Sequence, residues 1–282
     1  MDLLELGPLL HKPVRQLSLG ERMKVEFAAG IQQAAQYRIQ YTLYVLFSVI
    51  RPIIFLAAWA AVATAQGGRV GDFTAADFAG YYIALTIVIH LTTAWNSLEF
   101  ELEVRQGRFS PKLLRPLHPL HYSVVENIIW KVTTVPPLVA VLALIAWTFG
   151  ARFGTTPLHL VLFVPSIVLA AALCFLAGWC VASLAFWFTR IQTANTLFER
   201  TAFIFAGSIA PISLLPSALQ AAAYVLPFGY MLFVPAEILR GGVTVEVALL
   251  LIGGQLLWLA ATFALFRVVW RAGVRTYSSV GA

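Results

Sequence analysis

The sequence predicts an all-α membrane protein with six transmembrane helices, an interfacial helix before the first span, and a re-entrant helical pair before the last. Of its 282 residues, 60% are hydrophobic and only 11% are charged, with a mean hydropathy of +0.82. A soluble domain carries roughly 25% charged residues. The net charge of +6 is spread over the ends of apolar runs, which is typical of membrane topology. Because no single basic face or tail forms, we expect no nucleic-acid partner.

The elements follow from the apolar runs and the breaks between them. Residues 1–22 form a cytosolic lead-in, and an amphipathic helix at roughly 19–40 should lie in the membrane interface. The six spans that we expect cover about 41–65, 78–98, 122–149, 158–188, 197–215 and 243–266. Prolines divide 216–239 into what we expect to be two short helices that dip into the membrane and return. Residues 23–282 would then form one transmembrane domain.

The distribution of lysine and arginine favours six crossings over seven. With six, the segments on one side of the membrane hold 14 cations and those on the other hold three, Arg69, Arg152 and Arg240. Cytoplasmic loops carry the excess of cations. A seventh crossing through 216–239 would move three C-terminal arginines to the outside. We therefore predict that both termini are cytoplasmic.

A polar stretch from Trp95 to Tyr122 separates two of the apolar runs and organises the chain. Its first half is a charged helical continuation in which Glu101 and Arg105, spaced i, i+4, are close enough to pair. Gly107 offers the left-handed conformation that ends helices. The sequence thus predicts a helix end and a tight break.

A short basic helix should follow this break. Ser110 is a capping residue, Pro111 suits the first helical position, and Pro116 ends the helix. Its leucines need a partner, while the loop holds four cations and no metal-binding or nucleophilic set. The pattern indicates a docking surface, formed by Arg105, Arg108, Lys112, Leu113, Leu114 and Arg115.

Four stretches resemble the permeases of ABC-2 type exporters. They are the interfacial helix before Tyr41, RQGRFSPKLLRP at 105–116, the proline-rich segment at 215–241, and the ending WRAGVRTYSSVGA. The resemblance implies a dimer of six-span subunits, identical or sister, among the lipids of the bacterial cytoplasmic membrane. It also implies that the loop and the interfacial helix receive motion from a separate cytosolic ABC ATPase.

Residues 3–29 resemble the signature region of an ABC ATPase, with LSLGE at 17–21 in the position of its LSGGQ-type motif. No GxxxxGK[ST] loop occurs in the chain, so we expect no nucleotide site here and no cofactor, with ATP bound by the partner subunit. We interpret residues 1–22 as a relic, a gene-boundary artefact or a fusion, with Met23 as an alternative start. A chance match is the other interpretation.

Three polar residues within predicted spans are candidates for a functional role. Arg51 is near the middle of the first span, where an arginine has either a functional role or a structural partner. His90 fits a hydrogen-bonded packing residue better than a proton relay, and Lys131 fits a side chain that reaches toward the interface. His118 and His121 have HxxH spacing, but Pro119 separates them and no third ligand is near, so we expect no metal site.

The sequence therefore favours a transport subunit without chemistry of its own, the permease of an ATP-driven exporter. A membrane-embedded transferase would need clustered Asp, Glu or His side chains at the membrane interface, and the chain has only scattered ones. An ion-coupled transporter with inverted repeats would show two similar halves, but 41–149 and 158–266 differ in proline placement and loop length. A lipid, a glycan or an amphipathic drug would each suit as substrate.

Overall fold

The computed structural model describes residues 16–18, 20–21, 24–25, 28, 36, 38–114 and 118–277. The regular secondary structure of these residues is helical apart from one two-stranded hairpin, so the all-α expectation is confirmed. In chain order the elements are α2 (Arg38–Ala65), β1 (Arg69–Val70), β2 (Phe73–Thr74), α3 (Ala75–Thr92), α4 (Asn96–Arg105), α5 (Ser110–Leu113), α6 (Leu120–Phe149), α7 (Pro157–Ala182), η4 (Ser183–Phe186), α8 (Gln192–Phe205), η5 (Ile212–Leu214), α9 (Ser217–Val225), α10 (Pro227–Met231), α11 (Phe233–Arg240) and α12 (Val245–Thr276). Most of the helix expected at 19–40 lies outside the described residues.

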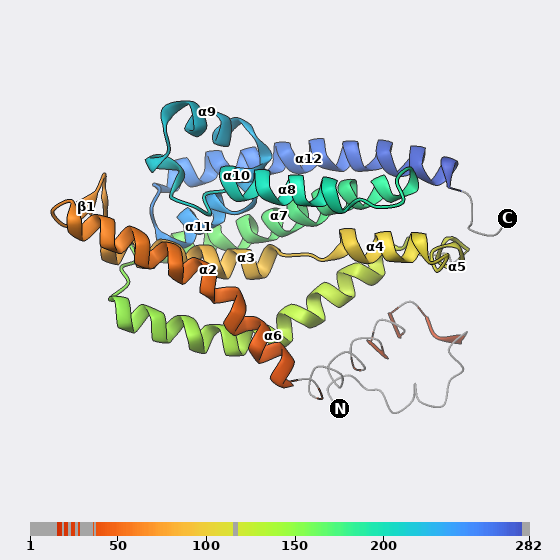
Figure 1. Cartoon of the computed structure of the whole chain (residues 1–282), viewed down its shortest axis with the longest axis horizontal. Helices are drawn as coiled ribbons and strands as arrows, with labels where there is room; N and C mark the ends of the chain where they lie inside the picture. The colour runs from red at the N-terminus through yellow and green to blue at the C-terminus, as the bar shows by residue number, and fades with distance from the viewer. Residues whose placement is uncertain are drawn as a thin grey trace. The chain divides into compact units, whose positions relative to one another are not determined.

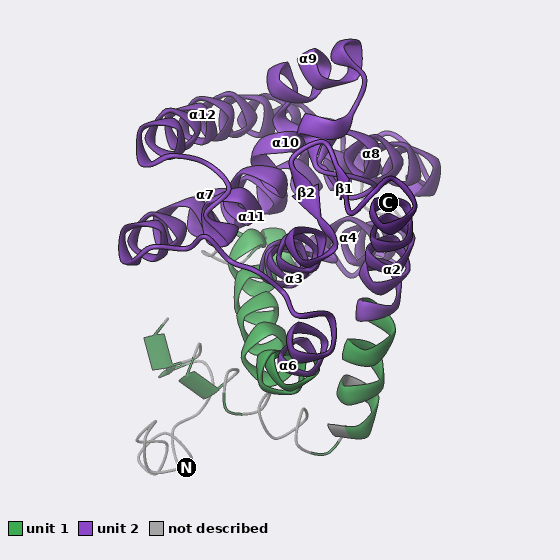
Figure 2. Cartoon of the chain, turned by 90° about the vertical axis from the view of Figure 1, so that its left-hand side faces the viewer, with its two compact units in different colours: residues 1–48, 112–141 green, residues 49–111, 142–282 purple. Residues whose placement is uncertain are grey.

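The chain divides into two compact units (Figure 2). One comprises 1–48 and 112–141, and the other 49–111 and 142–282. In the first unit, the edge of Tyr44 on α2 meets the ring of Trp130 on α6, with ring centroids 5.4 Å apart. The second unit holds the remaining helices and the hairpin, and it contains most of the core.

The helix α3 is the central element of the second unit. Within its span 67% of the residues are buried, against 17–28% for the other four spans that the described residues contain. It begins with a capping box, in which the Thr74 hydroxyl and the Asp77 carboxylate satisfy each other's backbone N–H groups. Gly80 lets α3 approach the loop before α7, because a Cβ there would strike the carbonyl of Arg152. In Figure 1, α3 lies beneath α7 and α11, and it packs against both.

The helices α7 and α12 run side by side and form the longest helix contact of this unit (Figure 1). Thr156 caps α7, Pro157 takes the first helical position, and His159 completes the capping box. Further along, the fully buried Gln255 of α12 donates from Nε2 to the carbonyls of Ser166 (3.2 Å) and Tyr230 (3.0 Å). This one amide joins α7, α10 and α12.

A non-helical stretch, 206–211, follows α8 and is almost entirely buried. The Tyr81 hydroxyl donates to the carbonyl of Gly207 at 2.7 Å. The Tyr82 hydroxyl and the Trp59 indole N–H both donate to the carbonyl of Ile209, at 2.7 and 2.8 Å. An unpaired backbone group would cost several kcal/mol in hydrocarbon. The break after α8 is stable because α2 and α3 supply these donors.

The helix bounds differ clearly from the expectation in three segments. The last span, expected at 243–266, is α12, which continues to Thr276. The helix expected at 78–98 ends at Thr92, because Thr93 turns to extended backbone and its hydroxyl bonds the Ile89 carbonyl. The segment 216–239 contains three short helices, α9, α10 and α11, instead of two, because Pro227 starts a new helix at the extended Leu226.

Five helices of the described residues are long and apolar enough to cross a membrane. The expected fifth span, 197–215, is not among them, since α8 has 14 residues and the irregular stretch follows it. The count of six crossings stays a prediction.

A buried ion pair fixes the end of α11. The carboxylate of Glu237 lies 2.6 Å from the guanidinium of Arg240, and their side chains are 4% and 14% exposed. The guanidinium also sits 4.7 Å from the ring centroid of Phe73 in β2. The N–H of Gly154 donates to the Arg240 carbonyl at 2.9 Å. The pair therefore holds α11 against the hairpin and the loop before α7.

We predict that Glu237→Gln destabilises the fold by about 3–5 kcal/mol, because it leaves a buried guanidinium without its counter-charge. Replacing both residues by methionine should cost less than the single change. Thermal unfolding in detergent measures both, with Glu246→Gln, at an exposed position of α12, as the control that should change little. Wild-type stability of Glu237→Gln would show that the pair contributes nothing to the fold.

Candidate functional site

The predicted break and short helix are present in the loop after α4. Arg105 Nη1 lies 3.4 Å from the carboxylate of Glu101, which confirms the predicted i, i+4 pair. Gly107 has a φ of +69°, which confirms its left-handed conformation at the helix end. Ser110 differs from the expectation, because its hydroxyl lies 3.0 Å from the Tyr277 hydroxyl instead of capping the short helix.

The residues of the predicted docking surface are largely accessible. Arg105 and Arg108 are exposed, and Leu114 is 89% exposed. Lys112 and Leu113 are half-buried, with the Lys112 ammonium 5.6 Å from the centroid of the Tyr122 ring. The sixth member, Arg115, lies outside the described residues. The side chain of Leu114 is thus accessible to a partner.

The charged helix α4 is tied to the start of α8 by a buried carboxylate. Glu101 is only 7% exposed, and its Oε2 accepts the N–H of Ile191, the N-cap of α8, at 3.0 Å. A carboxylate at this end also meets the positive pole of the helix dipole. One turn earlier, the Ser97 hydroxyl donates to Asn195 Oδ1 of α8 at 2.6 Å. The sequence predicted only the pair of Glu101 with Arg105, and the burial of Glu101 against α8 is a further finding.

An aromatic cluster lies beneath the loop and joins it to α7, η4 and α12. Its members are Phe100, Phe109, Trp179, Phe186, Phe266, Trp270 and Tyr277. Phe109, the residue before α5, is fully buried there, with its ring centroid 4.9 Å from that of Phe100 and 5.4 Å from that of Tyr277. Gly273 of α12 makes room for Phe186, since a Cβ would strike that ring.

Sequence reasoning missed this cluster. The available signal was the concentration of aromatic residues at 100–109, 175–188 and 263–277, around the ends of three apolar runs.

The three intramembrane polar candidates have different surroundings. Arg51 is exposed on α2, with its guanidinium 5.4 Å from the centroid of the Phe203 ring on α8. His90 is 4% exposed within α3. Lys131 belongs to the other unit, where its ammonium lies 3.4 Å from Asn127 Oδ1, one turn earlier on α6. Arg51 is thus the accessible charge of the three.

The HxxH pair precedes and begins α6. Leu120 N–H donates to the ring Nδ1 of His118, and the ring of His121 lies 3.0 Å from the His118 carbonyl. Burial and the neighbouring His121 lower the pKa of His118. Both rings therefore serve the helix start.

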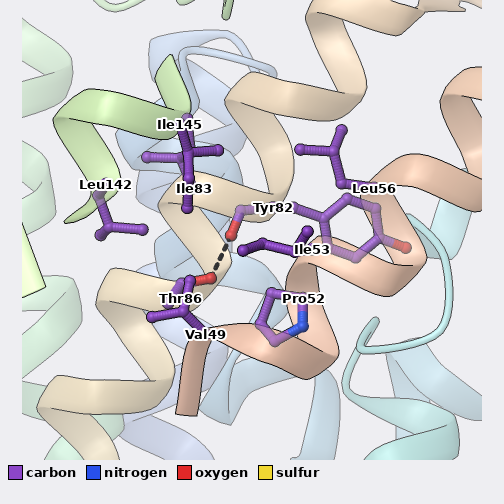
Figure 3. A pocket seen from close by; sticks show the side chains of 9 residues that line it. All are labelled: Val49, Pro52, Ile53, Leu56, Tyr82, Ile83, Thr86, Leu142 and Ile145. Atoms are coloured by element: carbon purple, nitrogen blue, oxygen red, sulfur yellow. Dashed lines mark hydrogen bonds between the residues drawn. The ribbon is translucent and has the colours of Figure 1, made fainter. Parts of the chain in front are cut away.

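A small recess lies between α2, α3 and α6 (Figure 3). It is lined by Val49, Pro52, Ile53, Leu56, Tyr82, Ile83, Thr86, Leu142 and Ile145. Its two hydroxyl groups are engaged, since Thr86 donates to the Tyr82 carbonyl at 2.6 Å and Tyr82 donates to the Ile209 carbonyl. The recess therefore suits apolar packing and offers no polar group that would orient a ligand.

Comparison with known proteins identifies the family of the chain. No curated protein matches the chain. The family model described as ABC-2 family transporter protein matches residues 45–281. Because this match covers most of its length, the chain belongs to the family of ABC-2 transporter proteins, as a multi-pass membrane component.

Proposed function

We propose that the chain is the permease subunit of an ATP-driven exporter in the bacterial cytoplasmic membrane and has no chemistry of its own. A separate ABC ATPase would bind the loop at 105–115 and supply ATP hydrolysis, and a second permease would complete the pathway. The observation that carries this proposal is the 89% exposure of Leu114, an apolar side chain in a cationic stretch of the sequence. The candidate substrates are a lipid, a glycan and an amphipathic drug.

The loop has the properties of a docking element. Burying a leucine in a partner's groove contributes about 1.5–3 kcal/mol. Cations such as Arg105 and Arg108 mainly steer and orient an incoming partner. In this proposal Leu114 supplies most of the binding free energy. The arginines orient the ATPase on the loop.

Two connections lead from the loop into the helices. Phe109 joins the loop to Phe186 and Trp270 through ring contacts at 5.7 and 6.0 Å. Glu101 joins α4 to the N-terminus of α8. A force applied at the loop would therefore reach α12 and α8 through packed side chains and a buried hydrogen bond.

The direction of α8 supports six crossings with both termini cytoplasmic. Arg51 and Phe55 of α2 contact Phe203, and further along α2 Trp59 bonds the carbonyl of Ile209. Residue numbers in these contacts increase along both segments, from 51 and 55 with 203 to 59 with 209. The helix α8 and the stretch after it therefore run parallel to α2. In the proposed topology, α8 with 206–211 is the fifth crossing.

We predict that Leu114→Asp abolishes co-purification of the ATPase with the detergent-solubilised permease, because the charge cannot enter an apolar groove. Stability should stay within about 0.5 kcal/mol of wild type, since the side chain is 89% exposed. The control is Leu219→Asp, at an exposed leucine of α9. Full recovery of the ATPase with Leu114→Asp would place the ATPase contact elsewhere.

We predict that Gly273→Ala reduces the coupling of ATP hydrolysis to transport while the ATPase still binds. The added methyl group displaces Phe186 from the aromatic cluster, whereas Gly253→Ala on the same helix meets open space and should behave as wild type. Transport per ATP hydrolysed in reconstituted vesicles gives the comparison, and tryptophan fluorescence reports the displaced ring. Equal coupling in the two alanine variants would count against the cluster as the link.

A further inference from the structure

Arg51 occupies an unusual position for a charged side chain. It lies nine residues after Thr42 in the span Thr42–Ala65, which is about 13 Å along the helix. It is exposed, and the large side chains of Ile50 and Ile54 beside it are 46% and 60% exposed. An arginine at this depth is costly in hydrocarbon and is retained where it faces a cavity or a partner.

The charge of Arg51 has no counter-charge among the described residues. Its guanidinium lies over the ring of Phe203, 5.4 Å from the ring centroid. Arg105 and Arg240, by contrast, each pair with a glutamate of their own helix. The aromatic face holds the guanidinium in place without using its N–H donors. Arg51 therefore presents N–H donors beside the ring of Phe203.

A polar stripe on α8 leads to this arginine. Three polar residues share one face of α8 with Phe203, because all four recur at helical spacing. They are Gln192, Thr196 and Glu199. Gln192 and Glu199 are exposed, and Thr196 and Phe203 are partly so. Polar residues on a membrane helix mark a water-filled path or a subunit contact. The stripe begins at the end of α8 that Glu101 caps and ends beneath Arg51.

We propose that Arg51, held against Phe203, binds the anionic headgroup, a phosphate or a carboxylate, of an amphipathic molecule that the permease carries. The inference rests on the proposed function. The guanidinium fork matches both oxyanions in a bidentate manner. The hydrocarbon chain lies along Ile50 and Ile54 of α2, which are exposed beside the arginine. This narrows the substrate to an anionic amphiphile.

Binding by the purified full chain in phosphatidylcholine nanodiscs tests the proposal. The probes are fluorescent lysophosphatidic acid, the fatty acid and the monoacylglycerol, all with the same acyl chain, and fluorescence polarisation measures each affinity. The wild type should prefer the two anions to the neutral probe by about tenfold or more. Arg51→Gln should remove this preference, and Arg51→Lys should keep part of it because the charge remains without the fork.

The matched control is Arg267→Gln. Arg267 is also exposed on a membrane helix and lies 5.8 Å from the centroid of the Phe263 ring, but on α12. This variant should keep the full preference. Thermal unfolding of each variant identifies any loss of fold. If Arg51→Gln is unfolded, the affinities of Arg51→Lys are compared with those of the wild type instead.

Two results would overturn the proposal. One is equal affinity of the wild type for the anionic and neutral probes. The other is a preference for the anionic probes that survives in folded Arg51→Gln. If the first result is accompanied by dissociation of a dimer in Arg51→Gln, Arg51 belongs to a contact with a second copy. The binding measurement contains no ATPase, so failure of the ATPase to co-purify would refute the exporter proposal and leave the anion site standing.

Discussion

The backbone carbonyls of 206–211 need hydrogen-bond donors within the membrane-spanning part of the chain. Much of the second unit is arranged to supply these donors. The carbonyls of Gly207 and Ile209 accept from two tyrosines of α3 and from Trp59 of α2. The same requirement explains why α3 is far more buried than the other spans, because its tyrosines must reach the break from within the helix packing. A helix break in hydrocarbon is possible only where side chains replace the lost partners.

Features with a local cause could be predicted from the sequence. The pairing of Glu101 with Arg105 and the left-handed Gly107 depend on residues within one or two turns, and both are confirmed. The apolar runs that became α2, α6, α7 and α12 also carry their signal within their own length. Contacts between distant segments could not be predicted in this way. Glu101 meets Ile191 across 90 positions, and Tyr81 meets Gly207 across 126.

The break between α3 and α4 has both a local cause and a cause that lies far away in the sequence. Consecutive threonines at 92 and 93 bond back to carbonyls of the preceding turn, an arrangement that bends or ends helices. The apolar run continues past these threonines to Leu98. A prediction from hydropathy alone therefore placed the end of the second span at 98 instead of 92. What decides the outcome is Asn96, whose side chain donates to the carbonyl of Phe175 on α7 and fixes the start of a separate helix. No local pattern carries that information.

The helix α8 connects the two sites that we propose. Its first residues are held by Glu101 and Ser97 of α4, and its last turn lies beside Arg51 of α2. Between these ends it has 14 residues, a length over which a helix behaves as a stiff rod of about 21 Å. In the proposed permease, a displacement of α4 by the ATPase moves α8 with it and shifts Phe203 relative to α2. Because Phe203 is what holds the guanidinium, the affinity for an anionic headgroup changes with the position of the loop, which is the coupling that an exporter requires.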